Sequence, residues 1–220
     1  MTDAFLNRLD ALRLAMRGKA QGGAGGSRRS RQTGSSAEAV GYLALTGGDR
    51  LGMHILKNGR AMRSPQFAGR AGYPRLTGFL DGCVPDGTEG TLTETVKHTE
   101  GLKKGLCFLI TDGYTEDALR ETLDYLRYMK QETAVIQVLS GGELRPDLDG
   151  ALRLEDMESG EKLDLLADRG ALDAYRDALD SFLKEVQENC ASREAHYLLL
   201  DNDQPFEGTF IPLLSGSGMI

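Results

Sequence analysis

The sequence of 220 residues contains no tryptophan and only three cysteines, Cys83, Cys107 and Cys190. The cysteines are scattered and form no Cys-x-x-Cys pair, a pattern typical of proteins kept in a reducing compartment. No run of about 18 apolar residues is present, so we expect no membrane-spanning helix. The N-terminal stretch is amphipathic and lacks a small-residue cleavage site after an apolar core, so we predict no signal peptide. Together these absences predict a cytoplasmic protein.

Positive charge is also scarce. Lysine and arginine number 26 against 33 aspartates and glutamates, which gives a formal net charge of -7. Nucleic acids and anionic membranes repel an acidic chain, so we exclude both as general partners. The composition is otherwise that of an ordinary soluble protein, 40% hydrophobic and 27% charged, and it predicts a substantial hydrophobic core.

Common catalytic motifs are missing as well. The sequence contains neither of the glycine-rich phosphate-binding patterns, GxGxxG and GxxxxGK[ST], and no GxSxG nucleophile motif. His98 and His196 have no identifiable acidic partner, and we expect His54 to be packed within a predicted strand. Cys107 and Cys190 lie on apolar patterns that predict core residues and not nucleophiles. We therefore predict that the protein is not an enzyme.

Glycine, serine and arginine gather in one stretch, residues 18–36, which has no apolar residue larger than alanine. This composition predicts a flexible linker. Apolar residues at helical spacing precede it and predict an N-terminal helix within residues 1–17. The remainder, residues 37–214, has the periodic patterns of a folded domain, with a predicted hairpin insertion at about residues 150–167.

Helical and strand patterns alternate through this domain. In chain order they predict several elements. The first are the end of a helix closed by Gly47 and Gly48, a strand from residue 50 with Leu51, Met53 and Ile55 on one face and a turn at Asn58-Gly59, and a helix starting near Thr91. These are followed by a strand at 106–111, a helix at 116–129, a strand at 133–140, the hairpin, a long helix capped by Asp168 and a strand at 196–201. Alternation of this kind predicts a layered α/β domain with a mostly parallel sheet.

The strand at 106–111 is followed at once by Asp112, in the stretch LCFLITDGYTEDAL. Ligands of open α/β sheets bind beyond the carboxyl ends of the strands, so this carboxylate occupies a position where such a fold places a site. Two interpretations stay open. Asp112-Gly113 is a common turn pair, which gives Asp112 a structural role. Alternatively, Asp112 is an oxygen ligand of Mg²⁺, together with a threonine hydroxyl from GTLTE and water.

The stretch LITDGYTED resembles the fourth-strand motif of von Willebrand factor A-type domains, whose aspartate belongs to a metal-ion-dependent adhesion site (MIDAS). More specifically, AVGYLALTGGDRLGMHIL, CFLITDGYTEDALRETLDYLR, VIQVLSGGELRPDLDGALRLEDMESGEKL and AYRDALDSFLKEVQENCASREAHYLLL together resemble the bacterial domain-of-unknown-function family fifty-eight. The resemblance covers residues 37–214, and RRSRQTGSSAE is similar to the family's segment ahead of that domain. It implies a Rossmann-like, von Willebrand A-type three-layer fold and a protein that accompanies a MoxR-type AAA ATPase.

The family's metal site has three elements, and the resemblance carries two of them onto this sequence. One is the aspartate, which corresponds to Asp112, and one is a threonine, which corresponds to Thr91 with Thr93 as its rival. The third, an Asp-x-Ser-x-Ser motif at the end of the first strand, is absent, because GSSAE runs directly into AVGYLAL. We therefore expect a sheet that lacks its first central strand, an incomplete metal site and weak or absent Mg²⁺ binding.

These expectations favour a non-enzymatic protein-interaction module, an adaptor for a MoxR-type AAA ATPase with a degenerate metal site. Two alternatives stay open: a truncated paralogue without activity, and a Rossmann-like hydrolase that uses Asp112 as nucleophile or base. A missing central strand also leaves an open sheet edge, through which two copies of the chain could pair. The sequence itself identifies neither the partner protein nor the oligomeric state.

Overall fold

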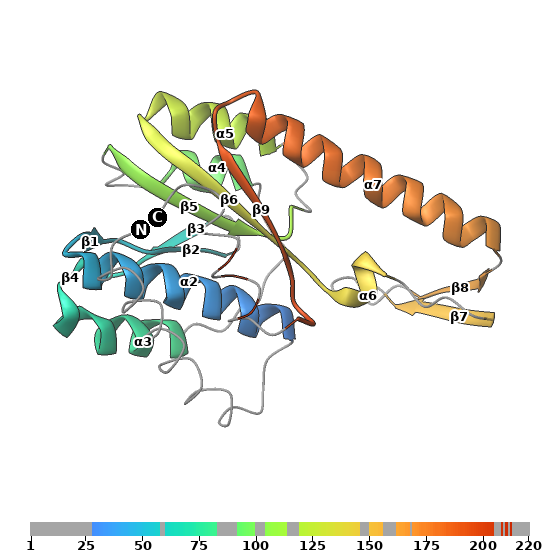
Figure 1. Ribbon diagram of the computed structural model, residues 1–220, viewed down its shortest axis with the longest axis horizontal. Helices are drawn as coiled ribbons and strands as arrows, with labels where there is room; N and C mark the ends of the chain where they lie inside the picture. The colour runs from blue at the N-terminus through green and yellow to red at the C-terminus, as the bar shows by residue number, and fades with distance from the viewer. Residues whose placement is uncertain are drawn as a thin grey trace.

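The computed structural model describes residues 28–57, 60–82, 92–99, 104–113, 119–145, 150–155, 162–167 and 169–204, together with residues 208, 210 and 212. Its ribbon is shown in Figure 1. The predicted N-terminal helix (1–17) and residues 18–27 of the predicted linker lie outside this part of the chain.

Three strands form one parallel sheet in the order β5–β6–β9. β5 spans Gly105–Thr111, β6 spans Gln131–Leu139 and β9 spans His196–Asp201. β6 is the central strand, and all of its residues from 133 to 139 are buried. A strand of a parallel sheet is buried on both faces because helices cover both sides of the sheet. The predicted α/β class with a parallel sheet is therefore confirmed.

Helices lie on the two faces of this sheet (Figure 1). α2 (Arg28–Gly47) packs on one face, and α5 (Leu119–Tyr128) and α7 (Arg169–Ala191) pack on the other. Successive side chains of a strand point to opposite faces, so the strands contribute to both cores. The core beside α2 contains Ala39, Val40, Ile136, Val138, Leu198, Leu200 and Phe210, and the core beside α5 and α7 contains Leu109, Leu119, Leu123, Val135, Val186 and Cys190.

α2 is longer than the sequence predicts, because it begins at Arg28, inside the predicted linker. The prediction of a flexible segment is therefore wrong for residues 28–36. No proline interrupts this stretch, and a helix extends at little cost once its neighbouring turns are ordered by packing. The buried Glu38 carboxylate accepts a 2.7 Å hydrogen bond from the hydroxyl of Tyr73, the first residue of α3 (Tyr73–Asp81). This contact joins the packed part of α2 to α3.

The strand predicted between residue 50 and the Asn58-Gly59 turn is divided in two, and the turn residues themselves lie outside the described part of the chain. The break falls at Gly52 and Met53. There the Met53 N–H donates a 3.0 Å hydrogen bond to the Ser64 hydroxyl, and the Ser64 N–H donates one of 2.9 Å to the Met53 carbonyl oxygen. Glycine inside a strand weakens it, which explains the division. The two antiparallel pairs are β1 (Arg50–Leu51) with β4 (Phe67–Ala68), and β2 (His54–Lys57) with β3 (Arg60–Arg63).

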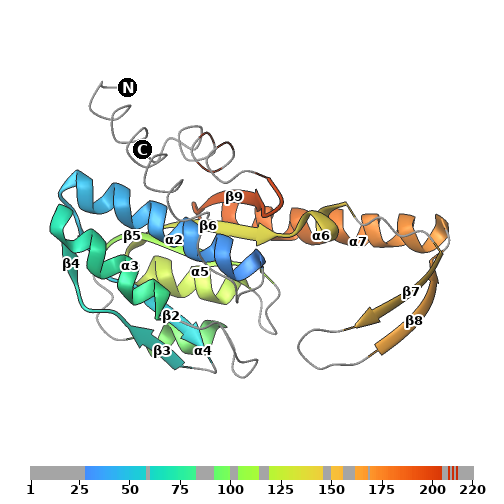
Figure 2. The same ribbon diagram turned by 90° about the horizontal axis from the view of Figure 1, so that it is seen from below.

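Other elements are η1 (Arg70–Gly72), α4 (Leu92–Lys97), α6 (Gly141–Leu144), β7 (Gly150–Glu155) and β8 (Lys162–Ala167). β7 and β8 pair antiparallel and form the predicted hairpin. α7 extends beyond the sheet, and the β7–β8 hairpin lies at its far end, away from the body of the domain (Figure 2). Among the helices that the structure describes, none is long and apolar enough to cross a membrane.

β5 lies at one edge of the three-stranded sheet. Within the described residues it pairs with β6 alone, and α2 makes its other main contact. The strand that the sequence predicts to be missing would be the second neighbour of β5, and its absence stays a prediction.

Candidate functional site

Asp112 lies at the carboxyl end of β5, where the sequence predicts it. The strand ends at Thr111, and Asp112 follows it, partly buried. Gly113 then turns the chain with φ at +83°, a left-handed conformation that glycine adopts without the steric cost of a β-carbon. The Gly113 N–H donates a 3.1 Å hydrogen bond to the Thr111 hydroxyl. A parallel sheet presents its ligand-binding groups at this edge.

Gln137 holds the backbone of this turn. It lies on β6 with its side chain fully buried, and its Nε2 donates a 2.8 Å hydrogen bond to the Asp112 carbonyl oxygen. Its Oε1 accepts a 2.7 Å hydrogen bond from the Tyr197 hydroxyl of β9. A buried amide needs a partner at each end, and here both partners are present. The bridge therefore fixes the Asp112 backbone relative to β6 and β9.

The turn after Asp112 is also tightly packed. A β-carbon added at Gly113 would lie 2.8 Å from Gln137 Nε2 and 3.2 Å from Cζ of Phe182 in α7. Both distances are shorter than the usual 3.5–4.0 Å or so between non-bonded heavy atoms. A side chain at Gly113 would therefore have to displace the ends of the Gln137 and Phe182 side chains as well as adopt an unfavourable backbone conformation, so glycine is favoured in this closely packed turn.

The ends of β6 and β9 lie at the same edge of the sheet. After β6, the Ser140 hydroxyl accepts a 3.1 Å hydrogen bond from the Glu143 N–H, and the Glu143 carboxylate accepts one of 2.7 Å from the Ser140 N–H. This reciprocal pair is a capping box that begins α6. After β9, Asp201 forms an ion pair with Arg145. Burial alone would raise the pKa of Asp201, but the hydrogen bonds from Arg145 and from the Asp203 N–H lower it overall. Capping and ion pairing give these carboxylates a structural role.

The predicted threonine ligand, Thr91, lies outside the described residues. Its rival Thr93 is a buried residue of α4, and the Thr93 hydroxyl forms a 2.9 Å hydrogen bond with the Thr122 hydroxyl of α5. This bond joins α4 to α5 and gives Thr93 a packing role. The assignment of Thr91 as a ligand stays a prediction.

Magnesium takes several oxygen ligands in near-octahedral geometry. In the part of the chain that the structure describes, no three histidine, cysteine, aspartate or glutamate side chains come together in a way that could hold a metal ion. Asp112 by itself supplies one carboxylate. One carboxylate is too few protein ligands for a metal ion whose coordination shell is formed mainly by protein groups. Weak or absent Mg²⁺ binding stays a prediction.

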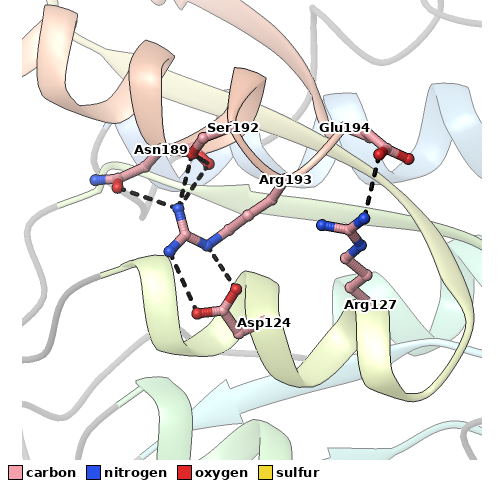
Figure 3. A network of polar contacts seen from close by, with 6 residues as sticks. All are labelled: Asp124, Arg127, Asn189, Ser192, Arg193 and Glu194. Atoms are coloured by element: carbon pink, nitrogen blue, oxygen red, sulfur yellow. Dashed lines mark hydrogen bonds and ion pairs between the residues drawn. The ribbon is translucent and has the colours of Figure 1, made fainter.

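A cavity of about 250 Å³ lies at the opposite edge of the sheet, where β6 and β9 begin. The guanidinium of Arg193 donates to both carboxylate oxygens of Asp124, at 2.7 and 3.3 Å. Beside it, Arg127 pairs with Glu194 at 3.1 Å (Figure 3). Each arginine is balanced by an adjacent carboxylate, and both pairs tie α5 to the turn between α7 and β9. We interpret this network as a structural brace and not as a ligand site.

The two cysteines that the structure describes have the surroundings predicted from the sequence: Cys190 is buried and Cys107 is partly buried. Burial raises the pKa of Cys107 and Cys190 to about 11, which disfavours the reactive thiolate at neutral pH. His54 is partly buried in β2, and burial together with Arg63 lowers its pKa. Cys83 lies outside the described residues. That the protein is not an enzyme stays a prediction.

A family model described as "Protein of unknown function DUF58" matches residues 12–187, which is most of the chain and includes Asp112 with its turn. The chain belongs to the DUF58 family. The family resemblance in the sequence is therefore confirmed. No curated protein matches this DUF58 chain.

Two solved structures are similar to this DUF58 protein. One is the conserved hypothetical protein BatB from Bacteroides thetaiotaomicron, with 14% identity, 87% of each chain covered and a TM-score of 0.47. The other is an aerotolerance-related membrane protein from Bacteroides fragilis, with 13% identity, 87% of this chain and 89% of that chain covered, and a TM-score of 0.46.

Sequence reasoning did not identify Gln137 or Tyr197 as supports of the Asp112 turn. One signal could have found Gln137, because it interrupts the apolar run AVIQVL. A polar side chain in the middle of a buried strand needs a specific partner. No pattern in the sequence identifies Tyr197 as that partner, because the contact joins residues 60 positions apart.

Proposed function

We propose that this DUF58 protein is a non-catalytic protein-interaction module of von Willebrand A-like type that acts as an adaptor for a MoxR-type AAA ATPase. The observation that supports the proposal is the setting of Asp112. Its backbone is clamped by Gln137 and is followed by Gly113 in a left-handed turn. A rigid turn holds one short carboxylate in a fixed position, which suits recognition of a partner group.

The chemistry of the contact follows from the donor set. Among the described residues, the Asp112 turn supplies one carboxylate and no complete set of metal ligands, and a carboxylate attracts cationic groups. A carboxylate binds lysine or arginine through charge-assisted hydrogen bonds, so the partner group in this proposal is a basic side chain. Within the proposal the module acts in the cytoplasm, where an AAA ATPase has access to ATP.

A binding titration tests the proposal. The full chain is immobilised, and a purified MoxR-type AAA ATPase from the same organism is added over a range of concentrations at constant nucleotide and Mg²⁺. We expect saturable binding that Asp112→Ala weakens about tenfold or more, because a charged partner loses its counter-ion. Asp49→Ala is the matched control, since Asp49 is an exposed aspartate in the loop between α2 and β1, and it should leave the affinity unchanged.

Absence of binding by the parent chain, or equal binding by the Asp112→Ala variant, contradicts the proposal. The hydrolase alternative has its own test with generic phosphate and carboxylate esters. Turnover by the parent that is lost in Asp112→Asn would replace the adaptor with an enzyme.

A further inference from the structure

The segment from Arg50 to Leu80 contains no acidic residue. Six of its residues are lysine or arginine, and the other 20 basic residues share the rest of the chain with all 33 acidic ones. The segment forms the strand pairs β1–β4 and β2–β3, then η1 and most of α3. A chain with a net charge of -7 therefore carries one strongly positive region, and such a region attracts an acidic partner.

The structure describes four arginine side chains in this segment, and all of them are exposed: Arg50, Arg63, Arg70 and Arg75. We call these four residues the basic surface. Within the described residues, none of their guanidinium groups forms a hydrogen bond or an ion pair. Arg127 and Arg193 differ, since each of them pairs with a neighbouring carboxylate. The arginines of the basic surface thus keep their donors free for a group outside the chain.

The fold gathers three of these arginines around β4. Arg50 lies opposite Ala68 in the β1–β4 pair, and Arg70 follows Ala68 by two residues. The Arg75 guanidinium lies over the ring of Phe67, the other residue of β4, at 5.9 Å from the ring centroid. A cation at this distance over an aromatic face is attracted by the ring. Arg75 is therefore held in position, while its donors stay free.

The fourth arginine, Arg63, ends β3 and follows Met62, an apolar residue that is 45% exposed. Protein–protein interfaces are enriched in arginine and methionine relative to the rest of the surface. β1 and β4 lie at the end of the domain opposite the β7–β8 hairpin, and β5 points away from them (Figure 1 and Figure 2). The basic surface is thus separate from the Asp112 turn, and an inference from it does not depend on the proposed adaptor function.

We propose that the basic surface docks an acidic segment of a partner protein, rich in aspartate and glutamate. Each guanidinium binds a carboxylate through two parallel hydrogen bonds. A peptide segment is short enough to contact this surface alone. A nucleic acid or an anionic membrane extends beyond the surface and meets the acidic remainder of the chain, which repels it over about 8 Å at physiological salt.

Fluorescence anisotropy tests the docking on the full chain, with a labelled short peptide in which glutamate and alanine alternate. We expect saturable binding that Arg63→Glu and Arg70→Glu each weaken about fivefold, because an attraction is replaced by a repulsion. Arg120→Glu is the matched control with the same change in net charge. Arg120 is exposed on α5, across the sheet from α2, and its reversal should leave the affinity within about twofold of the parent.

Measurements on the parent chain test the same inference where a variant fails to fold, which far-UV circular dichroism detects. Added salt should weaken binding of the glutamate peptide, and a peptide with glutamine in place of glutamate should not bind. Single-stranded DNA of the same length and vesicles that contain phosphatidylserine should bind more weakly than the glutamate peptide. Absence of peptide binding, equal effects of Arg63→Glu and Arg120→Glu, or tighter binding of the DNA or the vesicles would overturn the inference.

Discussion

Replacement of Gln137 with leucine should lower the free energy of unfolding by about 2–4 kcal/mol. The side chain is fully buried and makes two hydrogen bonds, one to the Asp112 carbonyl oxygen and one from the Tyr197 hydroxyl. Each hydrogen bond contributes about 1 kcal/mol net, and a buried partner left without a bond costs about 1–3 kcal/mol. Both partners are partly buried, so water compensates a part of that cost, and leucine regains some apolar burial.

Gln137→Glu tests the hydrogen bonds alone, because glutamate has nearly the same shape as glutamine and differs in the hydrogen bonds that it can donate. A protonated glutamic acid can donate to the Asp112 carbonyl oxygen as the amide does, whereas a carboxylate cannot. Burial raises the pKa of such a carboxyl in the folded state above its unfolded value, because it disfavours the charged form. The variant is therefore closest to the parent below about pH 4, and its relative stability falls as the pH rises through the folded-state pKa. At neutral pH we expect a loss of about 3 kcal/mol or more.

Urea unfolding followed by circular dichroism measures these effects, with unchanged m-values as the check that the same surface is exposed in each variant. Tyr197→Phe is the intermediate case, because it removes one of the two hydrogen bonds and should cost about 1–2 kcal/mol. A Gln137→Leu variant as stable as the parent would refute the bridge. A Gln137→Glu variant equally stable at acid and neutral pH would refute the role of the donated hydrogen bond.

Three further predictions concern other parts of the structure. Gly113→Ala should lower the free energy of unfolding by about 1–2 kcal/mol, because Gly113 has a positive φ and close neighbours. Gly52→Ala is the control: a β-carbon there meets no atom within 4 Å, and the loss in urea unfolding should be less than about 0.5 kcal/mol. Arg193→Ala should lower stability by about 1–2 kcal/mol, and lysine there should restore less than half of the loss in the same assay, because lysine cannot bond both carboxylate oxygens. The Arg145 contact lowers the pKa of Asp201, so the ion pair stabilises the fold above the unfolded pKa of about 3.8, and this stabilisation is lost as the pH falls. Asp201→Asn should therefore reduce the loss of stability at acid pH. An unchanged acid dependence of stability would contradict the ion pair.

The sequence predicts the sheet of this protein well because its strands have simple patterns. The stretches at 106–111 and 196–201 are short apolar runs, and the helix between Leu119 and Tyr128 has a regular apolar stripe. Local periodicity is sufficient for such elements. The same is true of the position of Asp112, because the end of a parallel strand can be located from the strand itself.

Two features were beyond the sequence for physical reasons. The helical state of residues 28–36 depends on packing of the rest of α2 against the sheet, whereas the local glycine and serine content predicts the opposite. The Gln137 bridge depends on three strands that meet only in the folded chain. The apolar run AVIQVL marks Gln137 as a polar residue in need of a partner, but no pattern in the sequence identifies Asp112 and Tyr197 as those partners.

The most direct test of the account is a thermal melt of the full chain with and without excess Mg²⁺, beside Asp112→Ala. A metal that binds only the folded state raises its melting temperature. An interaction module with a degenerate metal site predicts one cooperative transition for the parent and the variant, at temperatures that Mg²⁺ does not change. A Mg²⁺-dependent rise in the parent that is absent from Asp112→Ala would show a working metal site at Asp112 and contradict the account. Absence of any cooperative transition would also contradict it, and would favour a truncated paralogue without activity.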